Sequence, residues 1–279
     1  MPPRRARKAA APVPKPNDPH VLYQRAVQCP ESEIDFVDAT FRRIRGRRAM
    51  RLREDFCGTA FTSCEWILRR KSNTAVGLDV HAATLRWAER YNLAALIEEQ
   101  RARVSLLKRN VLHPGPGTGA MDVVLAMNFS WWVFKERRVL LDYFKSVRGS
   151  LVSDGVFFMD IYGGWESIKE LREKRRIGGR RRGFTYIWDQ DMVDPVNNHT
   201  LCHIDFKLAN GRLIRRAFTY DWRIWTIPET RELLEEAGFK RVTVYWEGDD
   251  GKGGGNGVFK PAKVGECCHT FIAYIVAER

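Results

Sequence analysis

The sequence predicts an α/β fold in which a mainly parallel, seven-stranded sheet carries helices on both faces and an antiparallel β unit follows the fifth strand. Two observations carry this prediction. Short apolar strands alternate with segments of helical spacing up to residue 161, a pattern typical of βαβ units. Beyond Gly164, aromatic and β-branched stretches follow one another, and the turn Asn210-Gly211 between two of them indicates a hairpin. The 279 residues, of which 44% are hydrophobic, suffice for one large domain with such an insertion.

The N-terminal part divides by composition into a tail and a helical cap. Residues 1–17 contain five basic residues and no acidic residue, and their prolines disfavour a helix, so we expect a disordered, solvated tail. A transit peptide or a nuclear signal is the alternative interpretation of this tail. Residues 18–49 are expected to form the cap, with a helix over 23–41 whose apolar face includes Ile34 and Val37.

The main domain is expected over residues 50–279 and begins with strands separated by helices. Continuous apolar runs predict the strands, and apolar residues at helical spacing predict the helices between them. The predicted strands are 50–57, 75–80, 104–111, 121–129 and 155–161, and the predicted helices are 61–70, 85–96 and 137–151.

The region after Gly164 is expected to have a different architecture. A helix over 166–176 leads through the Arg/Gly-rich loop 178–183 into an antiparallel lid at about 180–225, with strands at 184–188, 200–208 and 213–225. A further helix begins at Pro228, with Thr226 as its cap, and ends at Gly238. Two final strands complete the sheet at 242–246 and 270–277, joined by the Gly-rich loop 248–257.

The net charge of +13 is concentrated in three segments of the chain. These are the tail, residues 42–53 with seven arginines, and residues 169–183 with eight basic and two acidic residues. The remainder is mildly acidic, which disfavours a uniformly basic nucleic-acid-binding protein. No apolar run reaches the roughly 18 residues that a membrane helix needs. The six cysteines form neither a disulfide framework nor a zinc pattern, and no secretory signal is evident, so we expect a cytoplasmic protein without a metal.

Candidate ligand-binding residues fall at the carboxyl ends of the first three strands, where open α/β sheets bind ligands. The first strand ends in the segment EDFCGTA over 54–60, in which Gly58 permits a tight turn and the following helix offers free N–H groups. The second ends at Asp79, a carboxylate suited to the hydroxyls of a ribose, and the third ends near Asn110, where an adenine edge would lie. The G-x-G-x-x-G pattern is absent, which disfavours a dinucleotide.

Taken together, these segments resemble the class I S-adenosylmethionine-dependent methyltransferases. EDFCGTA is similar to their first motif, D/E-x-G-x-G-x-G, although Phe56 and Ala60 replace two of its glycines. Asp79 matches their ribose-binding acid, and Asn110 stands where their adenine-contacting residue usually stands. The segments RLREDFCGTA, NFSWWVF and FTYDWRIWTIPE also resemble sequences of a bacterial group of such enzymes. The resemblance implies a Rossmann-like fold, S-adenosyl-L-methionine as cofactor, and a cofactor site formed by Glu54, Asp55, Cys57, Gly58, Thr59, Asp79, Val80, Asn110, Val111 and Asn128.

The fourth strand and the lid supply the candidates for acceptor binding. In this superfamily the segment after the fourth strand usually lines the reacting centre, and here it lacks the D/N-P-P-Y/F pattern of enzymes that methylate nucleobase or glutamine nitrogens. Its tryptophans are candidates for stacking on a cation or a ring, with a place in the core as the alternative. Arg223 is a candidate partner of a carboxylate or phosphate, or else a salt-bridged arginine. The predicted acceptor-binding residues are Trp131, Trp132, Tyr186, Tyr220, Trp222 and Arg223, and the candidates for positioning or base catalysis are Asn128, Tyr162 and His199.

Three functions remain open from the sequence. The favoured one is transfer of a methyl group to a small molecule by in-line displacement, which requires alignment of nucleophile and methyl group and no fixed catalytic pair. The second is methylation of RNA or protein, with the basic segments as a docking surface. The third is a non-catalytic protein that binds the cofactor or acts by interaction. No membrane association is expected, and the oligomeric state is left open.

Overall fold

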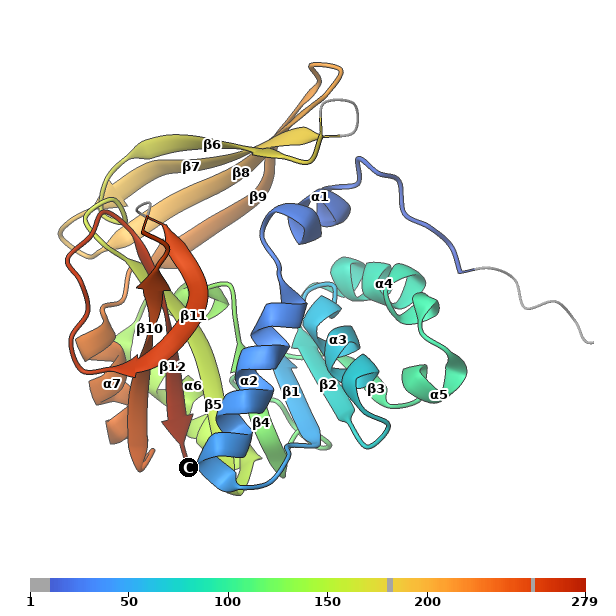
Figure 1. Cartoon of the computed structure of the whole chain (residues 1–279), viewed down its shortest axis with the longest axis vertical. Coiled ribbons are helices and arrows are strands. Elements are labelled where there is room, and N and C mark those ends of the chain that lie inside the picture. The colour runs from blue at the N-terminus through green and yellow to red at the C-terminus, as the bar shows by residue number, and fades with distance from the viewer. Residues whose placement is uncertain (1–10, 180–182, 252–253) are drawn as a thin grey trace, which may run out of the picture.

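The computed structural model describes residues 11–179, 183–251 and 254–279, and an eight-stranded sheet forms its centre. Five strands run parallel in the order β5-β4-β1-β2-β3, and β12, β10 and β11 continue the sheet in antiparallel fashion beyond β5 (Figure 1). Their bounds are β1 (Arg51–Asp55), β2 (Thr74–Asp79), β3 (Val104–Lys108), β4 (Met121–Ala126), β5 (Leu151–Gly163), β10 (Arg241–Asp249), β11 (Gly255–Ala262) and β12 (Phe271–Glu278).

The fold class is confirmed, with one strand more than predicted. Part of the region predicted as the loop 248–257 belongs to β10 and β11, which pair antiparallel from Val244 opposite Ala262 to Asp249 opposite Gly255. β11 was not predicted because glycine is depleted in strands, so a glycine-rich segment gives no local signal for one. Residues 252–253 of this loop lie outside the described part of the chain.

Helices cover both faces of the central sheet, as predicted. Buried apolar side chains of three helices cover one face, among them Val37, Trp66 and Ala88. Buried apolar side chains of two other helices cover the opposite face, among them Leu140 and Leu234. The first group consists of α2 (Pro30–Arg45), α3 (Phe61–Arg69) and α4 (Ala82–Tyr91), and the second of α6 (Arg137–Ser150) and α7 (Ile227–Glu236); the short helices η1 (Leu93–Ala95), α5 (Glu98–Arg101) and η2 (Ser130–Val133) lie in the connections.

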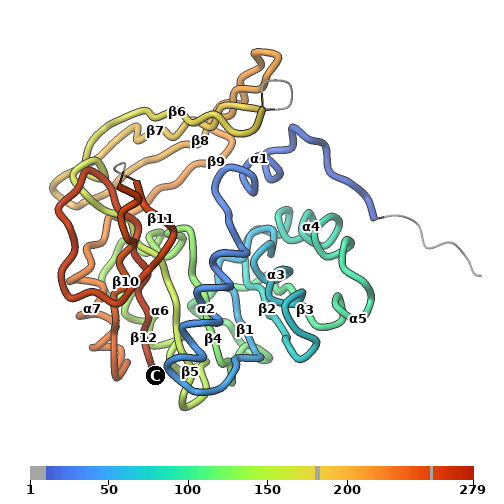
Figure 2. The backbone as a smooth tube through the Cα atoms, viewed as in Figure 1, coloured from blue at the N-terminus to red at the C-terminus, as the bar shows by residue number. Residues whose placement is uncertain are grey.

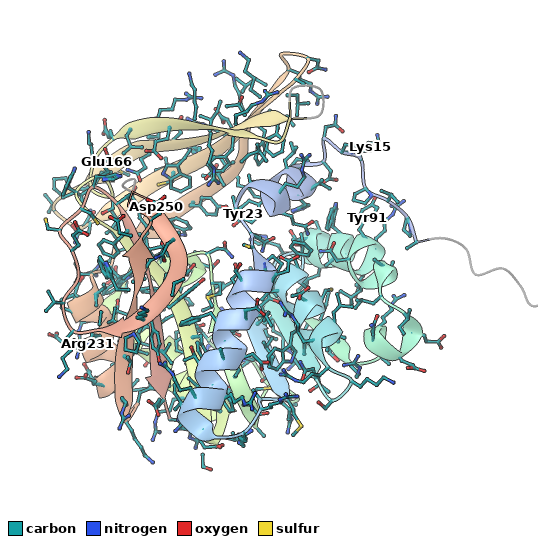
Figure 3. The ribbon with its side chains drawn as sticks, viewed as in Figure 1. Lys15, Tyr23, Tyr91, Glu166, Arg231 and Asp250 are labelled. Carbon is teal, nitrogen blue, oxygen red and sulfur yellow. The ribbon has the colours of Figure 1, made fainter. Side chains whose placement is uncertain are left out.

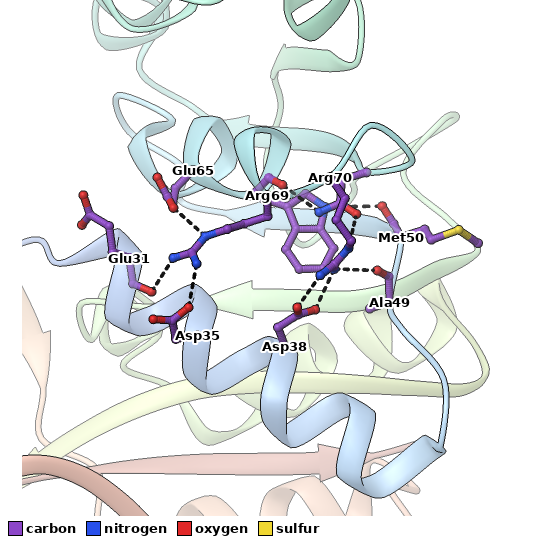
Figure 4. A network of polar contacts seen from close by, with 10 residues as sticks. Glu31, Asp35, Asp38, Ala49, Met50, Glu65, Arg69 and Arg70 are labelled. Carbon is purple, nitrogen blue, oxygen red and sulfur yellow. Dashed lines mark hydrogen bonds and ion pairs between the residues drawn. The ribbon is translucent and has the colours of Figure 1, made fainter.

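A polar network joins α2 to α3 on the first face (Figure 4). Arg69 donates to Asp35 at 2.7 Å and pairs with Glu65 on its own helix at 2.6 Å. Arg70 holds Asp38 with both terminal nitrogens and also donates to the carbonyl of Ala49 at 3.2 Å. These contacts fix α2 against α3 and place the start of α2 beside the carboxyl end of β1.

A second sheet of four antiparallel strands is inserted between β5 and α7 (Figure 2). Its strands are β6 (Leu171–Ile177), β7 (Phe184–Asp194), β8 (His199–Leu208) and β9 (Leu213–Arg223). The prediction of a helix over 166–176 is wrong, because this segment contains β6, whose residues pair with β7 from Leu171 opposite Gln190 to Ile177 opposite Phe184. Residues such as Glu, Lys and Arg favour helices only weakly, and the strand partner outweighs that preference. Residues 180–182 of the predicted loop lie outside the described residues.

The N-terminal helix is divided where a single helix over 23–41 was predicted. α1 (Pro19–Ala26) and α2 are separated at Cys29, because the residue before Pro30 is excluded from the helical conformation. Leu22 and Ala26 of α1 pack on the antiparallel sheet, so that α1 lies between this sheet and the main domain (Figure 1). Of the tail 1–17 that was predicted to be disordered, residues 1–10 lie outside the described residues, and residues 11–17 form neither helix nor strand.

Candidate cofactor and acceptor site

A cavity of about 530 Å³ opens at the carboxyl ends of β1, β2 and β4. The turn after β1 forms one wall, and its residues Phe56, Gly58 and Ala60 have φ values of 56°, 51° and 54°. These are the three glycine positions of the motif that the sequence resembles, and all three are left-handed here although two are not glycine. Each non-glycine residue in this conformation costs of order 1–3 kcal/mol, which the surrounding hydrogen bonds must offset.

Asp79 at the end of β2 is one of those compensating groups. Its Oδ2 accepts a hydrogen bond from the backbone N–H of Gly58 at 2.9 Å, and its Oδ1 accepts one from His81 at 2.8 Å. The carboxylate therefore fixes the turn and also lines the cavity. Because each carboxylate oxygen has two lone pairs, both oxygens retain capacity to accept further hydrogen bonds from a ligand.

Eight of the ten predicted cofactor-binding residues line this cavity, namely Cys57, Gly58, Thr59, Asp79, Val80, Asn110, Val111 and Asn128. The other two, Glu54 and Asp55, are not among its lining residues and are buried on opposite sides of β1. Glu54 accepts hydrogen bonds from the backbone and the hydroxyl of Ser63, and burial raises its pKa to about 8. Asp55 pairs with the buried Arg53 at 2.9 Å and accepts from the hydroxyl of Tyr143.

A second cavity of about 660 Å³ lies between the antiparallel sheet and the carboxyl end of β4. It shares four lining residues with the first cavity, so the two adjoin: Tyr23, Asn128, Tyr220 and Trp222. Figure 3 labels Tyr23 on α1 and Glu166 near the antiparallel sheet, two lining residues contributed by different parts of the chain. The inserted sheet therefore covers the region where the first cavity meets the second.

Seven aromatic residues are among those that line this second cavity. Tyr220 and Trp222 stack with ring centroids 4.4 Å apart, and Trp188 lies 6.1 and 6.3 Å from them. The buried Tyr162 Oη and Trp222 Nε1 have no hydrogen-bond partner among the described residues. Because burial raises the pKa of Tyr162, its hydroxyl keeps its proton at neutral pH. Two buried polar atoms are thus left for a polar group of a ligand.

Asn128 reaches the junction of the cavities through a left-handed turn. Asn128 and Phe129 have φ values of 58° and 56°. Their backbone N–H groups donate to the two carboxylate oxygens of Asp160 at 2.8 and 2.9 Å. Burial raises the pKa of Asp160 to about 7 against the opposing effect of these two donors. The sequence offered no signal for Asp160, which stands inside a strand of apolar residues.

Four other predicted residues are not among the residues that line either cavity. Trp131 and Trp132 are fully buried in the core, and Trp131 Nε1 donates to the carbonyl of Asp160 at 2.9 Å. His199 is the first residue of β8 and does not belong to either lining. Arg223 stacks on Trp225, donates to the carbonyl of Lys135 and pairs with Glu229. It is the salt-bridged arginine of the alternative interpretation.

The N-terminal segment supplies site residues that the sequence did not reveal. His20 and Gln28 line the cofactor cavity, and Tyr23 lines both cavities. Gln28 Oε1 is buried without a partner among the described residues, and burial raises the pKa of Tyr23, whose hydroxyl contacts Tyr220, to about 12. Within the described residues, no cluster of three metal-ligating side chains occurs and no helix is long and apolar enough to cross a membrane.

Comparisons with known proteins agree with this architecture. No protein-family model and no curated protein matches the sequence. Among solved structures, the chain is similar to the amino pentose methyltransferase CalS10 from Micromonospora echinaspora, solved with S-adenosylmethionine bound: TM-score 0.67, 17% identity, 93% of this chain and 95% of that chain covered. It is also similar to the sugar N-methyltransferase KedS8 from Streptoalloteichus, with a TM-score of 0.63, 16% identity, and 93% of this chain and 92% of that chain covered. A third similar structure is an S-adenosylmethionine-dependent methyltransferase from Clostridium acetobutylicum, with a TM-score of 0.65, 14% identity, and 92% of this chain and 96% of that chain covered. The chain therefore has the fold of S-adenosylmethionine-dependent methyltransferases.

Proposed function

We propose that the protein is an S-adenosylmethionine-dependent methyltransferase that acts on a small-molecule acceptor. The single observation that carries this proposal is the junction of two cavities at Asn128, Tyr220 and Trp222. One cavity has the strand-end residues that suit a nucleoside, and the other is covered by an inserted sheet. A donor and an acceptor placed in them would meet at the junction, which is the alignment that in-line displacement needs.

The residues of the first cavity fit the proposed cofactor. Asp79 would accept hydrogen bonds from the ribose hydroxyls, and Val80, Asn110 and Val111 would lie around the adenine. Gln28, whose Oε1 lacks a partner among the described residues, would accept a hydrogen bond from the ammonium group of the methionine portion. When bound, the cofactor supplies a methyl group on a positively charged sulfur, a carbon already activated for displacement.

The second cavity would bind and orient the acceptor. Its aromatic residues would pack against the acceptor, and Tyr162 Oη and Trp222 Nε1 would satisfy polar groups of the acceptor that burial removes from water. Asn128 at the junction would hold the attacking atom, because its side-chain amide can accept or donate a hydrogen bond. The solved structures described above include methyltransferases named for an amino pentose and for a sugar nitrogen, which supports a small molecule as the acceptor class.

The structure gives less support to RNA or protein as the acceptor. Two arginines of the basic segment 169–183 are engaged within the protein: Arg172 pairs with Asp189 and Asp205, and Arg175 lies over the ring of Tyr186. Such arginines are not available to phosphates without loss of those contacts.

Incubation with methyl-labelled cofactor and a cell extract separated into metabolites, RNA and protein tests the proposal. We expect label in the metabolite fraction and little label with the Asp79→Asn variant, whose cofactor binding should be weakened. Label in RNA or protein would refute the small-molecule acceptor. Absence of cofactor binding in calorimetry would refute the enzyme function altogether.

A further inference from the structure

The turn that carries Asn128 to the junction of the cavities is held by a group outside both of them. Asp160 follows Met159, the residue of β5 that pairs with the last residue of β4, Ala126. From there its side chain reaches the turn, accepts from the N–H of Asn128 at 2.8 Å and from the N–H of Phe129 at 2.9 Å. It is 8% exposed and is not among the residues that line either cavity.

Two features distinguish this contact from an ordinary turn. Both residues that donate to Asp160 have positive φ, a conformation that residues with a side chain adopt only when the surroundings impose it. The backbone carbonyl of Asp160 also accepts from Trp131 Nε1 at 2.9 Å, so one residue holds the segment after β4 at three points. The loss of an acceptor here would leave buried N–H groups unsatisfied and release the turn.

We propose that Asp160 is a positioning residue for methyl transfer: by fixing Asn128 and Phe129 in the left-handed conformation, it sets where the Asn128 side chain stands between donor and acceptor. This inference rests on the proposed function. It assigns to Asp160 an effect on turnover that is exerted through Asn128 and not by contact with either ligand. A buried carboxylate is costly, and the charge that acts on it is repulsive, from Glu33 on α2.

Kinetics of Asp160→Asn with a matched control variant test the proposal. The amide keeps the shape but presents an N–H₂ group to one of the two donors. We expect kcat for the identified acceptor to fall at least tenfold, while the Kd for the cofactor changes less than threefold. Asp205→Asn is the control, because Asp205 is also buried, accepts from the N–H of a left-handed residue, Arg216, at 2.7 Å, and is not among the residues that line either cavity. Its kcat should stay within twofold of wild type, and an equal loss in both variants would overturn the proposal.

A double-mutant cycle separates positioning from general destabilisation. If Asp160 acts through Asn128, then Asp160→Asn should reduce kcat much less in an Asn128→Ala background than in the wild type. Independent, multiplicative losses would overturn the proposal. Melting curves of all variants identify any loss that results from unfolding at the assay temperature.

One measurement needs no variant to fold and no turnover. In the wild type, the amide signals of Asn128 and Phe129 in NMR spectra should shift together with the protonation of Asp160, with a midpoint near its pKa of about 7. The other titratable groups that act at this position, Glu33 on α2, Tyr23 on α1 and Tyr274 on β12, are to be checked by their own signals. Amide signals of Asn128 and Phe129 that stay unchanged while the Asp160 carboxyl itself titrates would overturn the role of Asp160 in the turn. A wild type that binds cofactor but transfers no methyl group would instead refute the proposed function.

Discussion

Replacement of Asp79 by Asn should weaken cofactor binding more than it destabilises the fold. The carboxylate accepts hydrogen bonds from Gly58 and His81, and the two proposed ribose hydroxyls would add two more. Asparagine supplies one acceptor oxygen and turns an N–H₂ group toward the remaining donors. Because hydrogen bonds to a charged acceptor contribute about 1.5–3 kcal/mol and an unsatisfied buried donor costs about 1–3 kcal/mol, we expect a loss of about 1–3 kcal/mol. This corresponds to a tenfold to hundredfold higher Kd.

Asp122 offers a matched control at the opposite end of the sheet. Its Oδ2 accepts from the backbone N–H groups of Met50 and Arg51 at 2.8 and 2.9 Å, and it is 6% exposed. Asp122→Asn therefore removes comparable backbone contacts without touching the cavity. In calorimetry, Asp122→Asn should bind the cofactor as the wild type does, and its melting temperature should fall. Equal affinity of wild type and Asp79→Asn would refute the assignment of the ribose to Asp79.

Four further outcomes follow from the same contacts. Trp188→Ala should raise the KM for the acceptor and leave the Kd for the cofactor unchanged, because Trp188 lines only the second cavity; equal effects on both constants would contradict this. Trp131→Ala should lower the free energy of unfolding by about 3–5 kcal/mol in urea titrations, as expected for a fully buried ring. Burial raises the pKa of Glu54 to about 8 and that of Asp160 to about 7, so each carboxyl binds its proton more tightly in the folded protein than in the unfolded chain. The contribution of these protons to the stability of the fold is complete below pH 4 and is lost as the pH rises through 7 to 8. Urea titrations at pH 5.5 and 8.5 should therefore show a lower free energy of unfolding at the higher pH. Removal of residues 1–17 should leave the melting temperature within two or three degrees, roughly the effect of less than 1 kcal/mol, and a larger fall would show that the tail packs.

The parallel part of the fold could be predicted because its signals are local. Strands buried on both faces are continuous apolar runs, and β4 from Met121 to Ala126 is buried at every position. The cap at Thr226 was equally readable, since its side chain and that of Glu229 form the reciprocal capping bonds expected of that spacing. Chain segments whose own residues decide their structure are the ones that sequence patterns describe correctly.

The strands β6 and β11 could not be predicted because their partners decide their structure. β6 has the sequence LREKRRI, in which five of seven residues are charged, and it pairs with β7 along its whole length. β11 begins in a glycine-rich stretch and pairs with β10. In both cases the backbone hydrogen bonds to a neighbouring strand outweigh the preference of the residues themselves, and that neighbour is not visible in the local pattern.

In the candidate site, too, some residues could be predicted from the local sequence and others could not. Residues at strand ends were found because topology brings the ends of parallel strands together, whereas the aromatic residues could not be sorted into wall and core by composition. Trp131 and Trp222 are both aromatic, both buried and both close to Asn128 in the fold, yet only Trp222 lines a cavity. Which of the two rings faces a cavity depends on where each side chain points, and composition does not show that. Tyr23 was missed for a related reason, because α1 reaches the site by packing on the inserted sheet.

The turn after β1 has a left-handed backbone at the three positions that correspond to glycines of the motif. Phe56 and Ala60 occupy two of its glycine positions, and both still adopt φ values near 55°, so the ligand-facing backbone depends on the conformation and not on the absence of a side chain. Contacts from the neighbouring strand hold it there: the N–H of Cys57 donates to the carbonyl of Leu78 at 2.9 Å, and that of Gly58 donates to Asp79. The ring of Phe56 packs against Phe134 and Tyr143, and Phe56 and Phe134 are both among the residues that line the first cavity. The turn therefore has a left-handed backbone at all three positions, although only Gly58 is a glycine.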